Sequence, residues 1–140
     1  MERQIARRHD SGAPSRDPEA MSRDAERLLG EGVAAYRKGD VEGAIEKLRE
    51  GIHIDPLAFR LRYHLGLLYG KSGRHYDGIA ELERALDLNG SHFPALKNLA
   101  VLYEKAGFRK KAVEMWERSV GVAPDEEARE SIKAHLLSLL

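Results

Sequence analysis

The sequence predicts an all-α protein built from repeated helical hairpins. Three observations lead to this fold class. The chain has a 34-residue period, apolar residues recur three and four positions apart within each period, and glycine or proline stands where helices must end. Its 140 residues are about one domain's worth of chain, long enough to bury a core.

The period appears in several independent columns of the sequence. Glycines recur 34 residues apart at Gly39, Gly73 and Gly107, and a second column holds Pro56, Gly90 and Pro124. We therefore divide the chain into three repeats and two end segments. These are a flexible N-terminal segment 1–24, the repeats 25–58, 59–92 and 93–126, and a C-terminal capping helix 127–140, with 125 as its earliest start.

Each repeat is expected to form two amphipathic helices. In the second copy Leu65, Leu68 and Tyr69 are spaced for one helical stripe, and Ile79 and Leu82 begin another. Glycine between the two helices tolerates the left-handed conformation that ends a helix, and proline after the second helix cannot continue it. Small residues where the paired helices approach complete the pattern: Gly32, Ala44, Gly66, Gly78, Ala100 and Ala112.

These segments resemble the tetratricopeptide repeat family. The resemblance is carried by YRKGDVEGAIEKLREGIHIDP, YGKSGRHYDGIAELERALDLNG and YEKAGFRKKAVEMWERSVGVAP, one from each copy. It implies a right-handed helical-hairpin solenoid, an α-α superhelix whose concave groove is lined by the first helix of each repeat. It also implies a protein-protein interaction module or scaffold that holds a peptide or helix of another protein.

Carried over residue by residue, the resemblance assigns thirteen residues to the groove. They are Leu29, Val33, Tyr36, Arg37, Arg60, Tyr63, His64, Leu67, Lys71, Lys97, Asn98, Val101 and Lys105. The apolar members are expected to be exposed, and exposed apolar surface on a folded protein usually marks a binding site. With basic residues around them, the expected ligand combines apolar anchors with acidic neighbours.

Two alternatives stay open for this groove. The N-terminal segment or the capping helix could cover it in cis, and the protein could assemble with itself. The tail of the capping helix suggests weak self-association, because Leu137 and Leu140 fall outside its inward stripe. Met21, which opens a new run of charged and apolar residues, is a second candidate for the translation start.

One subclass of the family is not expected here. Its members grip the C-terminal carboxylate of heat-shock chaperones with lysine, asparagine and arginine side chains. The matching positions hold Leu29, Val33, His64, Pro94 and Asn98, most of which lack the required donors. The apolar groove is closer in residue type to bacterial secretion chaperones and assembly scaffolds.

Composition argues against several other functions. Twenty-three basic residues balance twenty-three acidic ones, so no global field favours nucleic acid. There is no cysteine, and no apolar run long enough to span a bilayer, so we expect a cytoplasmic protein without disulfides or membrane insertion. The six histidines show no metal-ligand spacing, and no catalytic cluster or cofactor fingerprint is found; we expect no enzyme activity, metal or cofactor.

Overall fold

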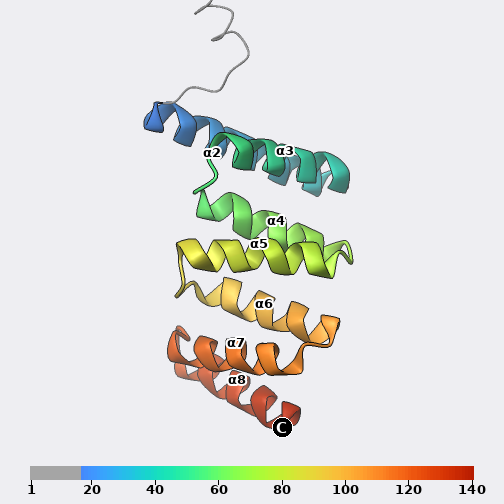
Figure 1. Cartoon of the computed structure of the whole chain (residues 1–140), viewed down its shortest axis with the longest axis vertical. Helices are drawn as coiled ribbons and strands as arrows, with labels where there is room; N and C mark the ends of the chain where they lie inside the picture. Colours follow the sequence, from blue (N-terminus) through green and yellow to red (C-terminus); the bar gives the residue numbers. More distant parts are fainter. Residues whose placement is uncertain (1–16) are drawn as a thin grey trace, which may run out of the picture. The chain divides into compact units, whose positions relative to one another are not determined.

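The computed structural model describes residues 17–140 (Figure 1). Its helices end close to the glycine and proline positions that the sequence predicts. All regular structure in that range is helical, and the chain divides into two compact units, the first ending at Leu61 and the second beginning at Arg62. In the first unit are α2 (Pro18–Arg37) and α3 (Val41–Ile54), and α4 (Phe59–Lys71) crosses the boundary. The second unit continues with α5 (His75–Leu88), α6 (Phe93–Ala106), α7 (Arg109–Gly121) and α8 (Glu126–Leu139).

Three glycines make the turns between paired helices. Gly39, Gly73 and Gly107 have φ angles of 85°, 82° and 87°, in the left-handed region that costs other residues free energy. Each follows the first helix of a hairpin, so the prediction of helix ends at these positions is confirmed. Pro56 and Pro124 likewise lie just beyond the ends of α3 and α7.

The first unit is a hairpin in which α2 packs on α3. A β-carbon added at Gly32 would lie 3.1 Å from Cδ2 of Leu48, so glycine at this position permits the close approach. Leu28 and Ala44 are completely buried at the same interface. Small residues thus have the packing role that the repeat pattern predicts.

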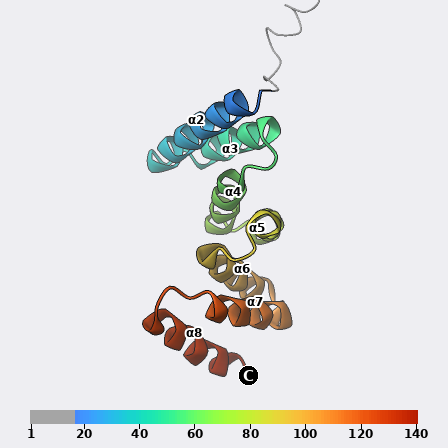
Figure 2. The same cartoon turned by 90° about the vertical axis from the view of Figure 1, so that its left-hand side faces the viewer.

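The second unit arranges its helices in two layers. Within it α4, α6 and α8 form one layer and α5 and α7 the other (Figure 2). The chain packs α5 on α6, α6 on α7 and α7 on α8. Its core includes the fully buried side chains of Leu65, Leu82, Leu96 and Leu99. Burial of such side chains contributes about 1.5 to 3 kcal/mol each.

The prediction of a flexible segment over residues 1–24 is wrong for residues 18–24. Helix α2 begins at Pro18, because Asp17 caps it by accepting a hydrogen bond from the Glu19 amide at 3.3 Å. Ala25 and Leu28 then bury one side of this longer helix. The rest of the prediction, over residues 1–16, lies outside the described residues.

The C-terminal helix α8 begins at Glu126, between the earliest predicted start at 125 and the predicted boundary at 127. Asp125 is its N-cap and accepts a hydrogen bond from the Ala128 amide at 2.8 Å. Ile132 is only 4% exposed, and α8 packs on α7. No helix among residues 17–140 is long and apolar enough to cross a membrane.

Leu137 and Leu140 are 74% and 84% exposed. They lie about one turn apart and share a face, so burying both in a self-contact would contribute about 3 to 6 kcal/mol before association costs. We expect the protein to self-associate weakly in sedimentation experiments, and Leu137→Glu/Leu140→Glu to abolish the effect. A wild-type chain that stays monomeric at high concentration would rule this out.

Candidate functional site

The thirteen predicted groove residues divide between the two units. Five belong to the first unit: Leu29, Val33, Tyr36, Arg37 and Arg60. Eight belong to the second: Tyr63, His64, Leu67, Lys71, Lys97, Asn98, Val101 and Lys105. Each group is described within its own unit.

In the first unit, the assignment of Leu29 to an exposed groove is wrong. Its side chain is 4% exposed and belongs to the core, next to the fully buried Leu28. The apolar stripe of α2 is therefore wide enough to bury two consecutive leucines. Val33 is half-buried and Tyr36 exposed, while Arg60 forms an exposed ion pair with Glu26 at 3.0 Å.

In the second unit, a small cavity lies between α4 and α6. Its volume is about 110 Å³. It is lined by Gly66, Leu67, Gly70, Lys71, Leu82, Asn98, Val101, Leu102 and Lys105. Five of the predicted groove residues therefore surround one hollow.

A larger cavity lies between α6 and α8, and Trp116 of α7 also lines it. Its volume is about 460 Å³. The lining residues are Lys97, Val101, Glu104, Lys105, Trp116, Ala128, Ser131, Ile132 and His135. Val101 and Lys105 border both cavities, so this side of α6 separates the two hollows.

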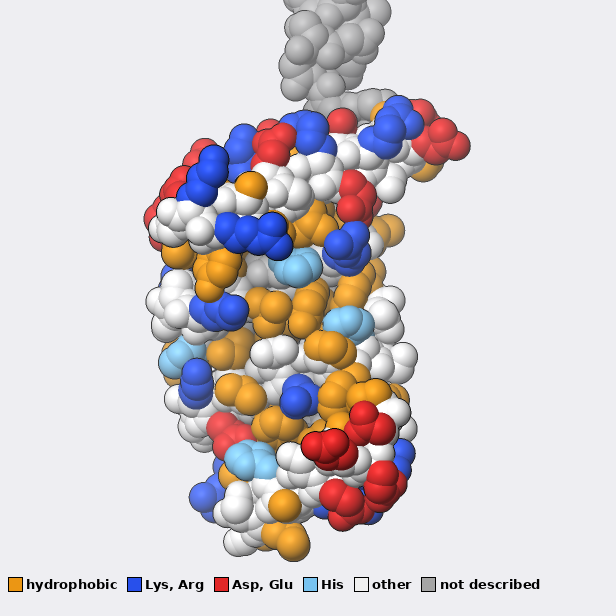
Figure 3. All heavy atoms as spheres, turned by 180° about the vertical axis from the view of Figure 1, so that it is seen from behind, with side chains coloured by type: hydrophobic (Ala, Val, Ile, Leu, Met, Phe, Trp, Pro, Cys, Tyr) orange, Lys and Arg blue, Asp and Glu red, His pale blue; other side chains and the backbone are white. Residues whose placement is uncertain are grey.

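We call the surface of the two cavities the inner face of the second unit. It brings together six of the eight predicted residues in this unit: Leu67, Lys71, Lys97, Asn98, Val101 and Lys105. The apolar members Leu67 and Val101 are half-buried, and the three lysines are exposed. Seen from the side of α4, α6 and α8, the second unit shows hydrophobic side chains gathered with basic ones among them (Figure 3).

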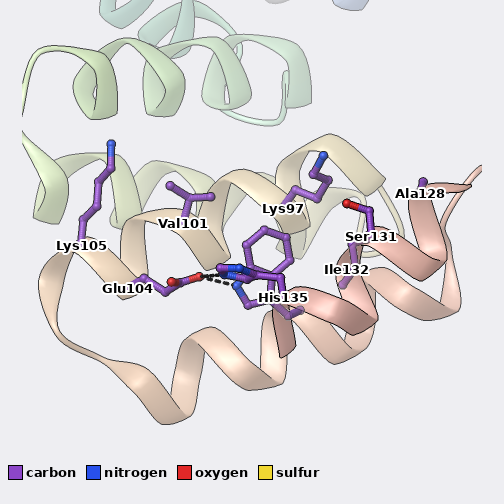
Figure 4. Close-up of a pocket in the computed structure, with 9 residues that line it drawn as sticks. Lys97, Val101, Glu104, Lys105, Ala128, Ser131, Ile132 and His135 are labelled. Carbon is purple, nitrogen blue, oxygen red and sulfur yellow. Dashed lines mark hydrogen bonds and ion pairs between the residues drawn. The ribbon is translucent and has the colours of Figure 1, made fainter. Parts of the chain in front are cut away.

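A polar cluster fastens α8 at the larger cavity. The Trp116 indole N–H donates to Oε2 of Glu104 at 2.6 Å, and Nε2 of His135 lies 2.8 Å from the same oxygen. The rings of Trp116 and His135 meet edge to face with centroids 5.0 Å apart. One carboxylate thus joins α6, α7 and α8 (Figure 4).

Sequence reasoning missed the contribution of these residues to the cavity. None of the thirteen residues predicted for the groove is Glu104, Trp116 or His135. An available signal was Trp116 itself, whose indole is larger than the leucine in the same column of the other repeats and carries a donor that needs a partner when buried.

Tyr63 and His64 line neither cavity and instead form an aromatic cluster with His92. The Tyr63 ring meets the His64 and His92 rings edge to face, with centroids 5.3 and 4.9 Å apart. Burial raises the pKa of the Tyr63 phenol, which therefore stays neutral at physiological pH. His92 is also the N-cap of α6.

Basic side chains outnumber acidic ones on the inner face. Among the described residues that line the smaller cavity none is acidic, whereas Lys71 and Lys105 are basic. In the larger cavity the acidic Glu104 already interacts with Trp116 and His135. Lys97 reaches over the Phe93 ring, with Nζ 5.3 Å from the ring centroid. Asn98 uses its amide to donate to the Pro94 carbonyl at 2.7 Å.

His92 makes the stability of α6 depend on pH. Its Nδ1 accepts a hydrogen bond from the Ala95 amide at 3.2 Å, and burial lowers the pKa of the imidazole. Protonation removes this acceptor and places a positive charge at the helix N-terminus. The folded state therefore binds fewer protons at His92 than the unfolded state does. The stability that His92 contributes is fully present above about pH 6.5 and is lost as the pH falls.

A His92→Asn variant keeps an oxygen that can cap α6 but does not titrate in this range. Between pH 7 and pH 5, the interval in which an ordinary histidine titrates, we expect this variant to lose less stability than the wild type. The expected difference is about 1 kcal/mol, the usual contribution of an N-cap. Urea unfolding at both pH values measures it. Equal losses in the two proteins would show that His92 is not the responsible group.

Among residues 17–140, no group of three or more histidine, aspartate or glutamate side chains is placed to hold a metal ion. The inner face is instead a surface of apolar hollows with cationic groups at their edges. Such a surface can bury apolar side chains and attract acidic ones.

Two repeat families match the middle of the chain. Residues 32–73 match the family described as TPR repeat, and residues 59–92 match the family described as Tetratricopeptide repeat. A curated relative, Photosystem I assembly protein Ycf3 of Synechococcus elongatus, is 27% identical over 122 residues. The match covers 74% of this chain and 70% of that protein.

Solved structures show the same fold. The first TPR of Spaghetti (RPAP3), bound to an HSP90 peptide, has a TM-score of 0.75 and 20% identity over 84% of this chain and 94% of that one. The type III secretion translocator chaperone SycD of Yersinia enterocolitica has a TM-score of 0.76 and 15% identity, covering 84% of each chain. The predicted all-α solenoid of helical hairpins is confirmed.

Proposed function

This chain is a tetratricopeptide repeat protein made of helical hairpins, and on that premise we propose that it binds a peptide segment or helix of another protein. The proposed site is the inner face of the second unit. Two apolar hollows side by side, with lysines at their edges, are the observation that carries the proposal. Apolar side chains of the ligand fill the hollows, and acidic side chains lie near the lysines.

Different side chains supply the affinity for the ligand and its orientation. Apolar side chains that enter hollows beside Leu67 and Val101 remove surface from water and supply most of the binding free energy. The exposed lysines contribute less, because water and salt screen them, but they steer an acidic ligand and fix its direction. Val33, Tyr36, Arg37 and Arg60 of the first unit remain predicted contributors.

The similar proteins support a role in assembly. The curated relative is named as an assembly protein, one solved structure holds a peptide, and another is a secretion chaperone. We therefore propose that this chain is an adaptor that holds a partner protein during assembly or secretion. Self-assembly through Leu137 and Leu140, whose side chains are exposed, is the second candidate.

A peptide-display experiment tests the proposal. A random twelve-residue library selected on the full chain should yield peptides that combine apolar anchors with Asp or Glu. We expect Val101→Asp to weaken binding of a selected peptide by about 2 kcal/mol or more, because Val101 borders both cavities. Lys71→Ala should cost less, and its effect should shrink at high salt. Isothermal titration calorimetry measures both.

The matched control is Val113→Asp, since Val113 is also half-buried but lies on α7 in the other layer. It should bind the peptide like the wild type. Circular dichroism confirms that both variants are folded. If Val113→Asp abolishes binding and Val101→Asp does not, the interface lies on the outer layer and the proposal is wrong.

A further inference from the structure

The two cavities differ in volume, and this difference determines which side chains each can hold. A cavity of about 150 Å³ is enough to take a benzene molecule in a protein interior. The cavity between α6 and α8, at about 460 Å³, exceeds this, and the one between α4 and α6, at about 110 Å³, falls short. The first has room for an aromatic side chain, and the second for a small aliphatic one.

We infer that the cavity between α6 and α8 is an anchor pocket for an aromatic side chain with a carboxylate beside it, and that the cavity between α4 and α6 takes a small aliphatic side chain of the same ligand. This inference rests on the proposed function and specifies its ligand. The occupant is an acidic peptide in which the two apolar side chains lie on opposite sides of Val101.

The walls of the larger cavity suit an aromatic ring. Its apolar lining comes from three helices, with Val101 on α6, Trp116 on α7 and Ile132 on α8. Trp116 and Ile132 are themselves almost completely buried, so their positions are fixed by the core. The indole of Trp116 is also held by its hydrogen bond to Glu104. A rigid apolar wall loses little entropy when it receives a ligand ring.

The charged side chains around the larger cavity determine where a ligand carboxylate is favoured. Lys97 and Lys105 line the cavity from the same helix, and both are exposed. The negative charge of Glu104 is drawn toward the indole N–H of Trp116 and toward His135, with contacts of 2.6 and 2.8 Å. A ligand carboxylate is therefore favoured on the lysine side of the cavity and disfavoured beside Glu104. Figure 4 shows Lys97 and Lys105 extending away from the Glu104 cluster.

Trp116 provides a direct reporter, since it is the one tryptophan in the sequence. Its indole N–H gives a single resonance in the ¹H–¹⁵N spectrum of the full chain. The probe is 3-phenylpropionate, which carries a ring and a carboxylate. Two matched probes separate the contributions: 3-phenylpropionamide keeps the ring without the charge, and propionate keeps the charge without the ring.

We expect 3-phenylpropionate to shift the Trp116 indole resonance saturably, with a dissociation constant in roughly the millimolar range that suits so small a ligand. The amide should bind about threefold or more weakly, and propionate should give no saturable shift. A Lys97→Gln/Lys105→Gln variant should remove the preference for the carboxylate over the amide.

A substitution that fills the larger cavity provides a second test. Ser131 is exposed at the cavity, so Ser131→Phe should fold while it blocks the pocket, raising the dissociation constant of the probe by roughly tenfold or more. Ala134→Phe introduces the same ring at an exposed position of α8 that does not line the cavity, and it should leave binding unchanged.

The outcomes distinguish this inference from the proposed function. If display-selected peptides bind through Val101 but lack an aromatic residue, or if Ser131→Phe leaves their affinity unchanged, the pocket assignment is wrong and the proposed function stands. An indole resonance that no aromatic probe shifts would also overturn the assignment. Failure of the proposed function would instead appear as peptide binding that tolerates Val101→Asp.

Discussion

Removal of residues 127–140 should lower the melting temperature by about 10 °C or leave the protein insoluble, because several buried contacts of the last hairpin depend on α8. Ile132 would be lost, and Trp116, now 6% exposed, would face water. The His135 partner of Glu104 would disappear as well. Thermal unfolding followed by circular dichroism measures the effect.

A point substitution isolates the same contact without shortening the chain. Ile132→Asp places a charge where the side chain is 4% exposed, and it should destabilise strongly. Lys133→Asp, at the neighbouring exposed position, is the control and should change little. Melting temperatures that are the same for Ile132→Asp, the truncated chain and the wild type would contradict the capping role of α8.

A Gly78→Ala substitution should destabilise the protein by about 2 kcal/mol or more, the usual effect of overpacking a tight contact. An added β-carbon would lie 2.8 Å from Cδ1 of Leu102, 3.0 Å from the Gly66 carbonyl oxygen and 3.2 Å from the Gly70 amide nitrogen. A side-chain end can move aside, but two backbone neighbours cannot without separating the helices. Urea unfolding of the full chain measures the loss.

Gly30→Ala is the control for this prediction, and we expect it to stabilise the protein instead. Nothing lies within 4 Å of a β-carbon added at Gly30, which is exposed in α2. Alanine has the higher helix propensity, so this variant should gain up to about 1 kcal/mol. Equal stability of Gly78→Ala and wild type would show that the helices of the second unit can separate at little cost.

The helices and turns could be predicted from the sequence because they depend on local chemistry. A glycine with a φ angle near 85°, as at Gly73, is required by the backbone of the turn itself, so its 34-residue recurrence identifies the hairpins. The N-cap of α8 at Asp125 is local in the same way. These features need no knowledge of what packs against them.

The errors and omissions concern long-range packing. Leu29 was assigned to the groove by its position in the repeat, yet the wide stripe of α2 buries it. Helix α2 also starts earlier than the repeat boundary, since Asp17 and Pro18 form a local start signal upstream of the periodic region. The larger cavity depends on how α8 lies against α6 and α7, which one sequence does not determine.

The most direct test of the central claim is the binding footprint of a display-selected peptide on the ¹⁵N-labelled full chain. The account predicts that backbone shifts concentrate on α4, α6 and α8 of the second unit, and that the Trp116 indole resonance moves with them. Shifts concentrated on α5 and α7, with the Trp116 indole unchanged, would contradict it and place the binding surface on the other layer.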